Sequence, residues 1–170
     1  MSIPNRRRRE GKTNYKKRMK VLRGARPRIV VRKTNRYIFA QYVLSSEAQD
    51  QVVFSMSSKD LLDHGWPKTA EGSLKSLPAA YLTGYLMGKL LKEKKTKDEP
   101  ILDKGLARHI YKSRIFAFMK GLQDAGIGVS SKKEEVFPEK DRLEGKHSGN
   151  KEVAKSIQKV KEAIDKKHAA

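Results

Sequence analysis

The first 36 residues constrain this chain more than any other stretch. They contain 15 Lys and Arg and one acidic residue, Glu10, so they carry a net charge of +14 out of +20 for the whole chain. Charge of this density repels itself within a compact fold and requires a polyanionic partner. Such a segment is typical of nucleic-acid binding, and we expect the rest of the chain to form the body that holds it.

The composition favours one modest core with polar extensions. Hydrophobic residues make up 37% and charged residues 34% of the 170 residues, enough for one ordinary domain with tails. The absence of Cys excludes disulfides and thiolate metal sites, and it is compatible with a cytoplasmic protein. We find no secretory signal and no apolar run of about 18 residues, so we predict no membrane partner.

The basic segment is expected to contain one short helix. Asn14 can cap a helix over residues 15–23 that Gly24 ends, whereas residues 3–13 should be extended or disordered when free. The apolar seam of this helix consists of Tyr15, Met19 and Leu22. Such a seam can dock on a core and leave the surrounding cations for phosphates. A solvated tail explains four adjacent arginines less well, and the seam is too thin for insertion at a membrane surface.

Three strands follow at short spacing, which favours an antiparallel meander. We predict strands over residues 28–33, 37–44 and 50–57, with a tight turn at Asn35, a residue type that tolerates positive φ. In the second strand, Ile38, Ala40, Tyr42 and Leu44 should share one face. In the third strand, Val52, Phe54 and Met56 should share one face. On the first strand, Arg28 and Arg32 share a face and continue the basic surface.

Helices are expected to cover this sheet. The longest, over residues 77–95, is apolar on most sides and should be buried on most sides. It leads through a β–α–β crossover to a short strand over residues 100–103, which is then parallel to a strand of the meander. A further helix should begin after Ser113 and end at Gly126. Its inward residues should be Ile115, Phe118, Met119 and Leu122.

Shorter elements complete the prediction. Residues 58–64 should form one helical turn, and residues 127–129 a last short strand. A terminal helix over residues 151–167, capped by Ser148 or Asn150, has a narrow seam of Val153, Ile157, Val160 and Ile164. Because such a helix is marginal alone, we expect it to dock on a partner or to be poorly ordered.

The predicted fold class is therefore α/β. A three-strand antiparallel meander and a parallel strand after a crossover helix form a mixed sheet that helices cover, flanked by a basic N-terminal arm and a C-terminal helical tail. We divide the chain into an RNA-binding arm (1–25), a globular core (26–130) and a C-terminal extension (131–170).

Signals for catalysis are scarce. The chain has neither a phosphate-binding GxxxxGK[ST] loop nor a GxGxxG motif, and its four His residues are scattered without metal-ligand spacing. Nuclease chemistry needs clustered carboxylates, which the basic segment lacks. We therefore predict no enzyme activity, catalytic residue, cofactor, metal site or small-molecule substrate. Tyr15, Tyr37 and Trp66 could stack on unpaired bases, although Trp66 could equally fill the core.

An ordered set of segments resembles the family of large-subunit ribosomal protein eighteen, whose members bind 5S ribosomal RNA. The segments are 15–23, 26–41, 78–86, 114–126 and the pairs Phe137-Pro138 and Asp141-Arg142. The resemblance covers residues 6–145 and implies a three-layer α/β body on 5S rRNA in the central protuberance. Its tail beyond Ser130 and its short length are similar to archaeal members, whereas residues 151–167 match no motif of the family.

The sequence thus predicts a cytoplasmic protein of the large ribosomal subunit, with 5S rRNA, large-subunit rRNA and neighbouring ribosomal proteins as partners. An RNA-processing or RNA-modifying enzyme and a DNA-compacting protein are the alternatives. The candidate RNA-binding residues are Arg6, Arg7, Arg8, Arg9, Lys12, Tyr15, Lys16, Arg18, Lys20, Arg23, Arg26, Arg28, Arg32, Lys33, Asn35, Arg36 and Tyr37.

Overall fold

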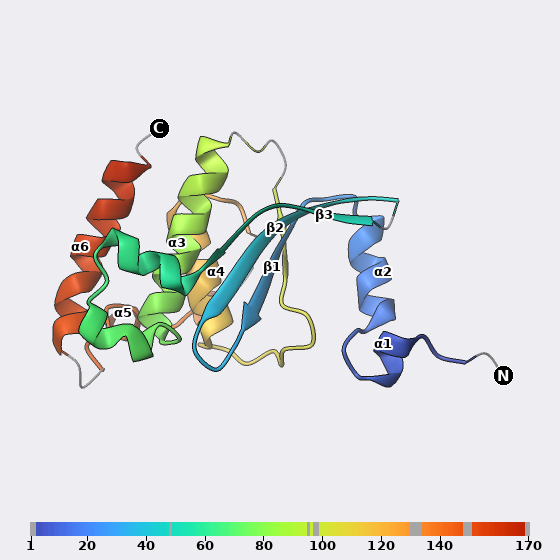
Figure 1. Cartoon of the computed structure of the whole chain (residues 1–170), viewed down its shortest axis with the longest axis horizontal. Helices are drawn as coiled ribbons and strands as arrows, with labels where there is room; N and C mark the ends of the chain where they lie inside the picture. The colour runs from blue at the N-terminus through green and yellow to red at the C-terminus, as the bar shows by residue number, and fades with distance from the viewer. Residues whose placement is uncertain are drawn as a thin grey trace.

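The computed structural model describes residues 3–47, 49–94, 96, 99–129, 134–147 and 151–168. Its elements, in chain order, are α1 (Arg6–Arg9), α2 (Tyr15–Arg23), β1 (Arg28–Lys33), β2 (Ile38–Ser46), β3 (Gln49–Ser57), η1 (Ser58–His64), η2 (Lys68–Ser73), α3 (Leu77–Glu93), β4 (Ile101–Asp103), α4 (Arg114–Asp124), η3 (Glu134–Val136), α5 (Lys140–Leu143) and α6 (Lys151–Lys167). Figure 1 shows α1 and α2 at one end of the long axis and α6 at the other.

The four strands form one mixed sheet in the order β3-β2-β1-β4. Both hairpin pairs are antiparallel, and β4 runs parallel to β1 with Arg28 opposite Ile101. The crossover between β1 and β4 includes α3, which packs on the sheet face that carries Ile29 and Ala40. The predicted α/β class and mixed sheet are therefore confirmed.

The alternation predicted for the hairpin of β2 and β3 fails beyond Tyr42. Tyr42 lies opposite Phe54 but Val43 lies opposite Val52, so β3 carries one extra residue at this point. An extra residue moves the following side chains to the other face of the strand and increases the local twist. Val52 therefore lies on the other face from Phe54 and is 49% exposed. On β2, Leu44 is also exposed, whereas Val43, opposite buried Arg28, is buried.

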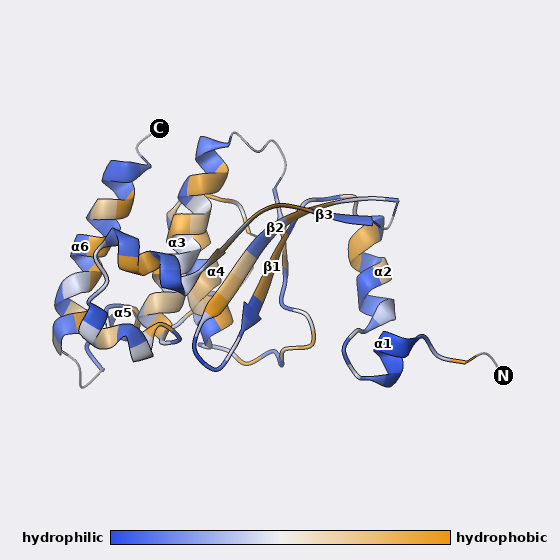
Figure 2. Cartoon of the chain, viewed as in Figure 1, coloured by the Kyte–Doolittle hydropathy of each residue, from blue (hydrophilic) through white to orange (hydrophobic). Residues whose placement is uncertain are grey.

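Helix α3 lies at the centre of the molecule and is buried over most of its length, as predicted (Figures 1 and 2). Its closest neighbour is α4, because each helix offers a glycine at their crossing. A Cβ atom on Gly84 would lie 2.1 Å from the Phe118 carbonyl oxygen, and one on Gly121 would lie 2.1 Å from the Tyr81 carbonyl oxygen. The two backbones therefore approach more closely than any side chain would allow.

Helix α6 packs against α3 of the same chain, so the prediction that its apolar seam docks on an external partner, or that the helix is poorly ordered, is wrong. All four residues of its apolar seam are buried in the common core. Polar contacts fix the C-terminal end of α6 on α3. There, Asp165 accepts a hydrogen bond from the Tyr85 hydroxyl at 2.7 Å and pairs with Lys89 at 2.6 Å. Burial raises the pKa of Asp165, but these hydrogen bonds outweigh it and hold that pKa below its ordinary value.

Several local predictions also differ from the structure. Residues 127–129 form no strand, and residues 6–9 form a helical turn where an extended chain was expected. The hairpin loop is closed by Thr34, whose amide and hydroxyl both hydrogen-bond to the Tyr37 carbonyl, and it does not use a left-handed Asn35. The predicted caps Ser148 and Asn150 lie outside the described residues, and the division into three parts stays a prediction.

The glycine contact between α3 and α4 predicts the effect of one added methyl group. Gly121→Ala should destabilise the protein by about 1–3 kcal/mol, because the clashing atoms belong to the backbone of α3 and cannot rotate away. Urea denaturation measures this change. Gly72→Ala is the matched control, since its Cβ would meet nothing within 4 Å, and an equal loss in both variants would contradict the packing argument.

The burial of α6 predicts that its seam contributes to global stability. Ile164→Ala should lower the free energy of unfolding by about 2–5 kcal/mol, because a fully buried side chain leaves a cavity. Lys159→Ala, on the exposed side of the same helix, should stay within about 0.5 kcal/mol. If Ile164→Ala left the denaturation midpoint unchanged, α6 would not be part of the cooperative core.

Candidate nucleic-acid interface

A buried arginine joins three strands at the end of the sheet nearest the basic arm. Arg28, the first residue of β1, is only 3% exposed. Its Nη2 atom lies 2.5 Å from Asp50 Oδ1 on β3, and its Nη1 atom lies 3.5 Å from Asp103 Oδ2 on β4. Ser45 on β2 accepts a further hydrogen bond at 2.9 Å. The charge of Arg28 is therefore neutralised inside the protein.

This position bears on the prediction that Arg28 binds RNA, which stays a prediction. A guanidinium that is buried between two carboxylates cannot reach a phosphate without leaving both of them unpaired, which would be costly. The sequence placed Arg28 on a basic face together with Arg32, and the two do share that face of β1. The carboxylates of Asp50 and Asp103, which are distant in sequence, converge on Arg28 only in the folded chain.

The Asp50 carboxylate also holds the basic helix α2 in place. Arg18 of α2 pairs with Asp50 at 3.0 Å. Burial raises the pKa of Asp50, but hydrogen bonds from Ser45, Arg28 and Arg18 outweigh it and lower that pKa below its ordinary value. Lys17, on the same helix, donates a hydrogen bond to the Gly105 carbonyl at 3.0 Å. Arg18 therefore acts as an anchor of the arm.

Helix α2 forms as predicted, but its attachment differs. The Asn14 side chain accepts a hydrogen bond from the Lys17 amide and caps the helix. The expected apolar seam is not buried, because Met19 is 52% exposed and Tyr15 and Leu22 are only half-buried. Polar contacts from Lys17 and Arg18 replace the apolar docking that the spacing suggested.

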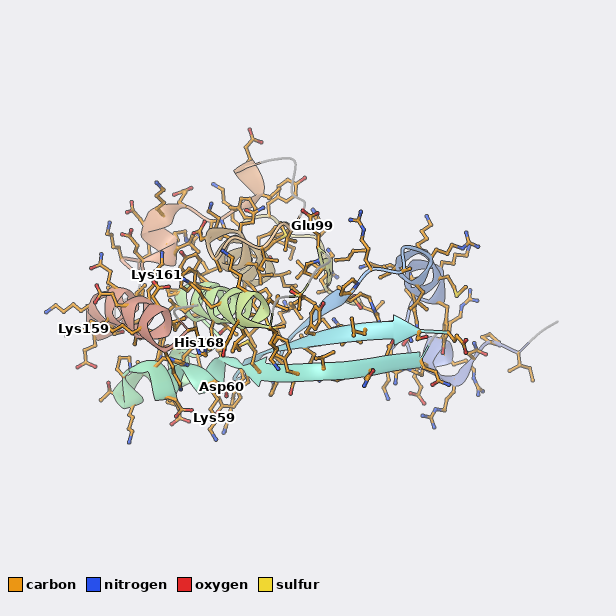
Figure 3. All side chains as sticks on the ribbon, turned by 90° about the horizontal axis from the view of Figure 1, so that it is seen from above. Lys59, Asp60, Glu99, Lys159, Lys161 and His168 are labelled. Atoms are coloured by element: carbon orange, nitrogen blue, oxygen red, sulfur yellow. The ribbon has the colours of Figure 1, made fainter. Side chains whose placement is uncertain are left out.

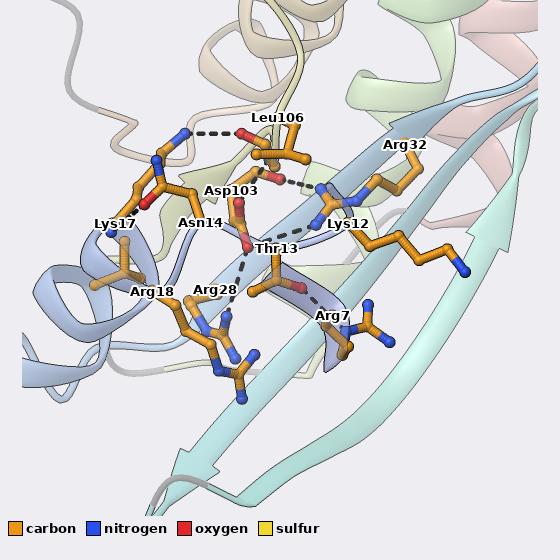
Figure 4. A pocket seen from close by; sticks show the side chains of 12 residues that line it. Arg7, Lys12, Thr13, Asn14, Lys17, Arg18, Arg28, Arg32, Asp103 and Leu106 are labelled. Carbon is orange, nitrogen blue, oxygen red and sulfur yellow. Dashed lines mark hydrogen bonds and ion pairs between the residues drawn. The ribbon is translucent and has the colours of Figure 1, made fainter. Parts of the chain in front are cut away.

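Between α2, β1 and the loop after β4 lies a hollow of about 160 Å³ (Figure 4). Six cationic side chains and one carboxylate, Asp103, line it. The cations are Arg7, Lys12, Lys17, Arg18, Arg28 and Arg32. Arg32 links β1 to β4 beside this hollow, because the Arg32 Nη1 atom donates a hydrogen bond to the Asp103 carbonyl at 2.8 Å. The hollow therefore concentrates positive charge at the base of the arm.

Most of the remaining candidate cations point into solvent, as the side chains around α1 and α2 in Figure 3 illustrate. Within the described residues, the only acidic side chain of the arm, Glu10, pairs with Arg6 and Lys12. The exposed candidate cations that make no ion pair with any described residue are Arg7, Arg8, Arg9, Lys16, Lys20, Arg23, Arg26, Lys33 and Arg36. These side chains are available for an external anion.

The structure separates the hairpin loop from the arm. Asn35, Arg36 and Tyr37 lie at the opposite end of β1 from Arg28, about 20 Å away along the strand. Tyr37 is half-buried, and its hydroxyl lies 3.5 Å from Glu71 of η2. Arg32 lies between the two ends, on the sheet face opposite the core. The candidate residues therefore form a strip along β1 rather than one cluster.

One exposed aromatic side chain on this strip was missed from the sequence. Phe39 is 43% exposed, lies opposite Arg32 in the sheet and meets Tyr37 edge-on at 6.5 Å between ring centroids. The signal was present, because inward Ile38 and Ala40 leave Phe39 on the outer face. Trp66 is instead a core residue, 2% exposed, whose indole N–H donates to the Ala70 carbonyl.

The described residues contain no cluster of three His, Asp or Glu side chains that could hold a metal ion. A search of the same residues also finds no helix long and apolar enough to cross a membrane. The distinguishing feature of the described surface is thus its exposed positive charge, held on the sheet by ion pairs with Asp50 and Asp103.

Comparisons with known proteins identify a family of ribosomal proteins, which is consistent with this exposed positive charge. Residues 2–100 match the family described as ribosomal large subunit proteins 60S L5, and 50S L18. Large ribosomal subunit protein uL18 of Korarchaeum cryptofilum (strain OPF8) is 46% identical over 142 residues, which cover 84% of this chain and 70% of that protein. The chain therefore belongs to this family of large-subunit ribosomal proteins. The predicted family, role in translation and location in the large ribosomal subunit are confirmed.

The Arg28 network predicts how stability depends on pH. Asp50→Asn should lower the free energy of unfolding by about 1–3 kcal/mol near pH 7, because buried Arg28 then keeps only Asp103 as a charged partner. Since the pKa of Asp50 is lower in the folded state, its contribution is present above about pH 4 and is lost as pH falls further.

Denaturation of both proteins between about pH 7 and pH 3 measures this difference, which should shrink below about pH 4. Glu10→Gln is the control, since its ion pairs with Arg6 and Lys12 are exposed and should contribute at most about 1 kcal/mol. If Asp50→Asn had no more effect than Glu10→Gln, the buried network would not anchor the arm.

Proposed function

We propose that this protein binds 5S rRNA through its basic arm and the outer strip of β1, and helps to hold that RNA in the central protuberance of the large subunit. The observation that carries the proposal is a set of exposed cations with no ion-pair partner among the described residues. Several of them lie on α2, which Arg18 and Lys17 fasten to β3 and to the loop after β4. Family membership supports a ribosomal RNA as the anion.

The arm would contact phosphates, and the strip would contact bases. Arginines at residues 6–9 suit bidentate phosphate contacts, which position the RNA without reading its sequence. Phe39, beside Arg32 and Tyr37, offers an aromatic ring on an open sheet face, where an unpaired base could stack. Affinity would come mainly from the arm, and selectivity from the strip.

The protein would act as a structural component and not as a catalyst. Among the described residues, the carboxylates beside the cationic hollow pair with Arg28, Arg18 and Arg32 and are therefore occupied. The DNA-compacting alternative has less support, because the family match points to ribosomal RNA and the helices α3 and α4 are largely buried.

The far end of the molecule offers a separate surface. Four lysines of α6 are exposed, namely Lys155, Lys159, Lys166 and Lys167. Because α6 and the arm lie at opposite ends (Figure 1), one RNA helix would not engage both at short range. We propose large-subunit rRNA or neighbouring ribosomal proteins as the partners of α6.

Binding to 5S rRNA and to an unrelated structured RNA at matched salt tests the proposal. If the chain neutralises about 6–10 phosphates, its affinity should fall by roughly 10³–10⁵ between about 50 and 200 mM salt. Replacing Arg6, Arg7, Arg8 and Arg9 with Gln in the full chain should weaken binding and make the salt slope shallower by up to about four. This design leaves the α2 anchor intact.

The matched control removes the same charge from the other end, by replacing Lys155, Lys159, Lys166 and Lys167 with Gln. These lysines are exposed, so their replacement should leave 5S rRNA binding unchanged. Equal binding to both RNAs would reduce the protein to a nonspecific polycation and contradict the 5S assignment. Equal losses in both variants would contradict the role given to the arm.

A further inference from the structure

A second hollow, of about 450 Å³, lies between β4, α4 and the segment after α4. Its size falls within the range of about 300–1,000 Å³ that is typical of small-molecule sites. Its floor is apolar and includes Leu102, Ile115 and Met119. The proposed function leaves this cleft unused.

Three aromatic rings form one wall of this cleft and contact one another edge-on. The His109 ring lies 5.0 Å from Phe116 and 5.4 Å from Tyr111, and Tyr111 lies 6.1 Å from Phe116. Phe116 is buried, whereas His109 is exposed and Tyr111 is 54% exposed. The wall therefore has a fixed base and two rings with accessible surface.

The backbone holds Tyr111 in this position at some cost. The next residue, Lys112, has a φ of 55°, in the left-handed region that non-glycine residues seldom adopt. Its amide donates to the Val136 carbonyl at 2.8 Å, and its ammonium pairs with Glu139 at 2.8 Å. Strain that the surrounding structure maintains in this way is concentrated at functional positions.

The rim of the cleft is cationic. Lys17, Arg26 and Lys104 lie there, against Glu99 as the single carboxylate among the lining residues. Burial lowers the pKa of Lys104, and the charge of Lys17 lowers it further. Lys17 and Lys104 line the same cleft, and neither pairs with a carboxylate among the described residues, so a bound anion would reduce their repulsion.

We propose that this cleft binds one unpaired nucleotide of 5S rRNA, with its base against Tyr111 and His109 and its phosphate on Lys17, Arg26 and Lys104. This inference rests on the proposed function, because Lys17 lines both this cleft and the cationic hollow of the arm. An RNA strand bound by the arm therefore passes directly beside the cleft.

A nucleotide fits these features better than a protein segment does. Unpaired bases are recognised by stacking on aromatic rings and by cations at the backbone, and both are present side by side here. A hydrophobic peptide would use the apolar floor but would leave three rim cations without an anion. An acidic peptide would satisfy the rim but not the rings.

The first test compares affinities of full-length variants for 5S rRNA. Tyr111→Ala should weaken binding by about 5- to 150-fold, which is the effect of losing one stacked base, and should leave the salt slope unchanged. Tyr111→Phe should bind like the wild type because the ring is kept. Lys104→Gln should instead make the salt slope shallower by about one.

Ile110→Ala is the matched control, since Ile110 is 56% exposed in the same loop but does not line the cleft. It should bind 5S rRNA like the wild type. A loss equal to that of Tyr111→Ala would overturn the inference, because it would show that the loop and not the ring matters. Thermal unfolding of each variant identifies losses that arise from misfolding.

The RNA side of the test does not depend on the fold of any variant. A series of 5S rRNAs, each with one abasic unpaired position, should contain one position that weakens wild-type binding but does not further weaken Tyr111→Ala. The absence of such a position would overturn the inference. Shielding of Tyr111 in the intact subunit by a neighbouring protein, without a nucleotide crosslink to the cleft, would also overturn it.

These outcomes separate the cleft from the proposed function. If the variant with Gln at residues 6–9 loses affinity while Tyr111→Ala does not, the arm binds 5S rRNA and only the inference about the cleft fails. If the wild type does not prefer 5S rRNA to an unrelated RNA, the proposed function fails, and the inference about the cleft fails because it rests on that function.

Discussion

The contact on which the basic surface depends is that of buried Arg28 with Asp50 and Asp103. These two carboxylates come from β3 and β4, at the two edges of the sheet, so the guanidinium ties both edges to β1. Asp50 also receives Arg18, which fastens α2. One buried positive charge thus holds two carboxylates in place, and one of them, Asp50, fastens the helix that carries many more positive charges. Without the carboxylates, α2 would repel the first strand.

This arrangement affects binding as well as stability. A free polybasic tail loses conformational entropy when it binds RNA, and that cost reduces affinity. Helix α2 has already been ordered by its cap at Asn14 and by its contacts to Asp50 and Gly105. Its exposed lysines therefore meet a phosphate backbone from fixed positions. Fixed positions also favour one RNA shape over another, which mobile charge alone cannot do.

Features with a local cause were predictable from the sequence. Helix α2 follows from its Asn14 cap, the burial of α3 from its apolar periodicity, and parallel β4 from the crossover rule. Features with a nonlocal cause were not. The extra residue at Val53 shifts the register without a glycine or proline to signal it, and the burial of Arg28 depends on carboxylates far along the chain. The exposure of Phe39 could have been predicted from the strand alternation, because its neighbours Ile38 and Ala40 are buried. The basic residues of this strip gave a stronger signal of RNA binding than this single aromatic residue did.

The apolar seam of α6 is too narrow to stabilise the helix in isolation, yet it is buried in the fold. A narrow apolar stripe cannot stabilise an isolated helix, but α3 is apolar on several sides and needs more cover than the sheet and α4 provide. The tyrosines of α3 complete the match, because Tyr85 donates to Asp165 and lies 4.9 Å from the Lys161 ammonium. The apolar excess of α3 therefore explains why the lysine-rich helix is part of the body, with its charged side turned outward.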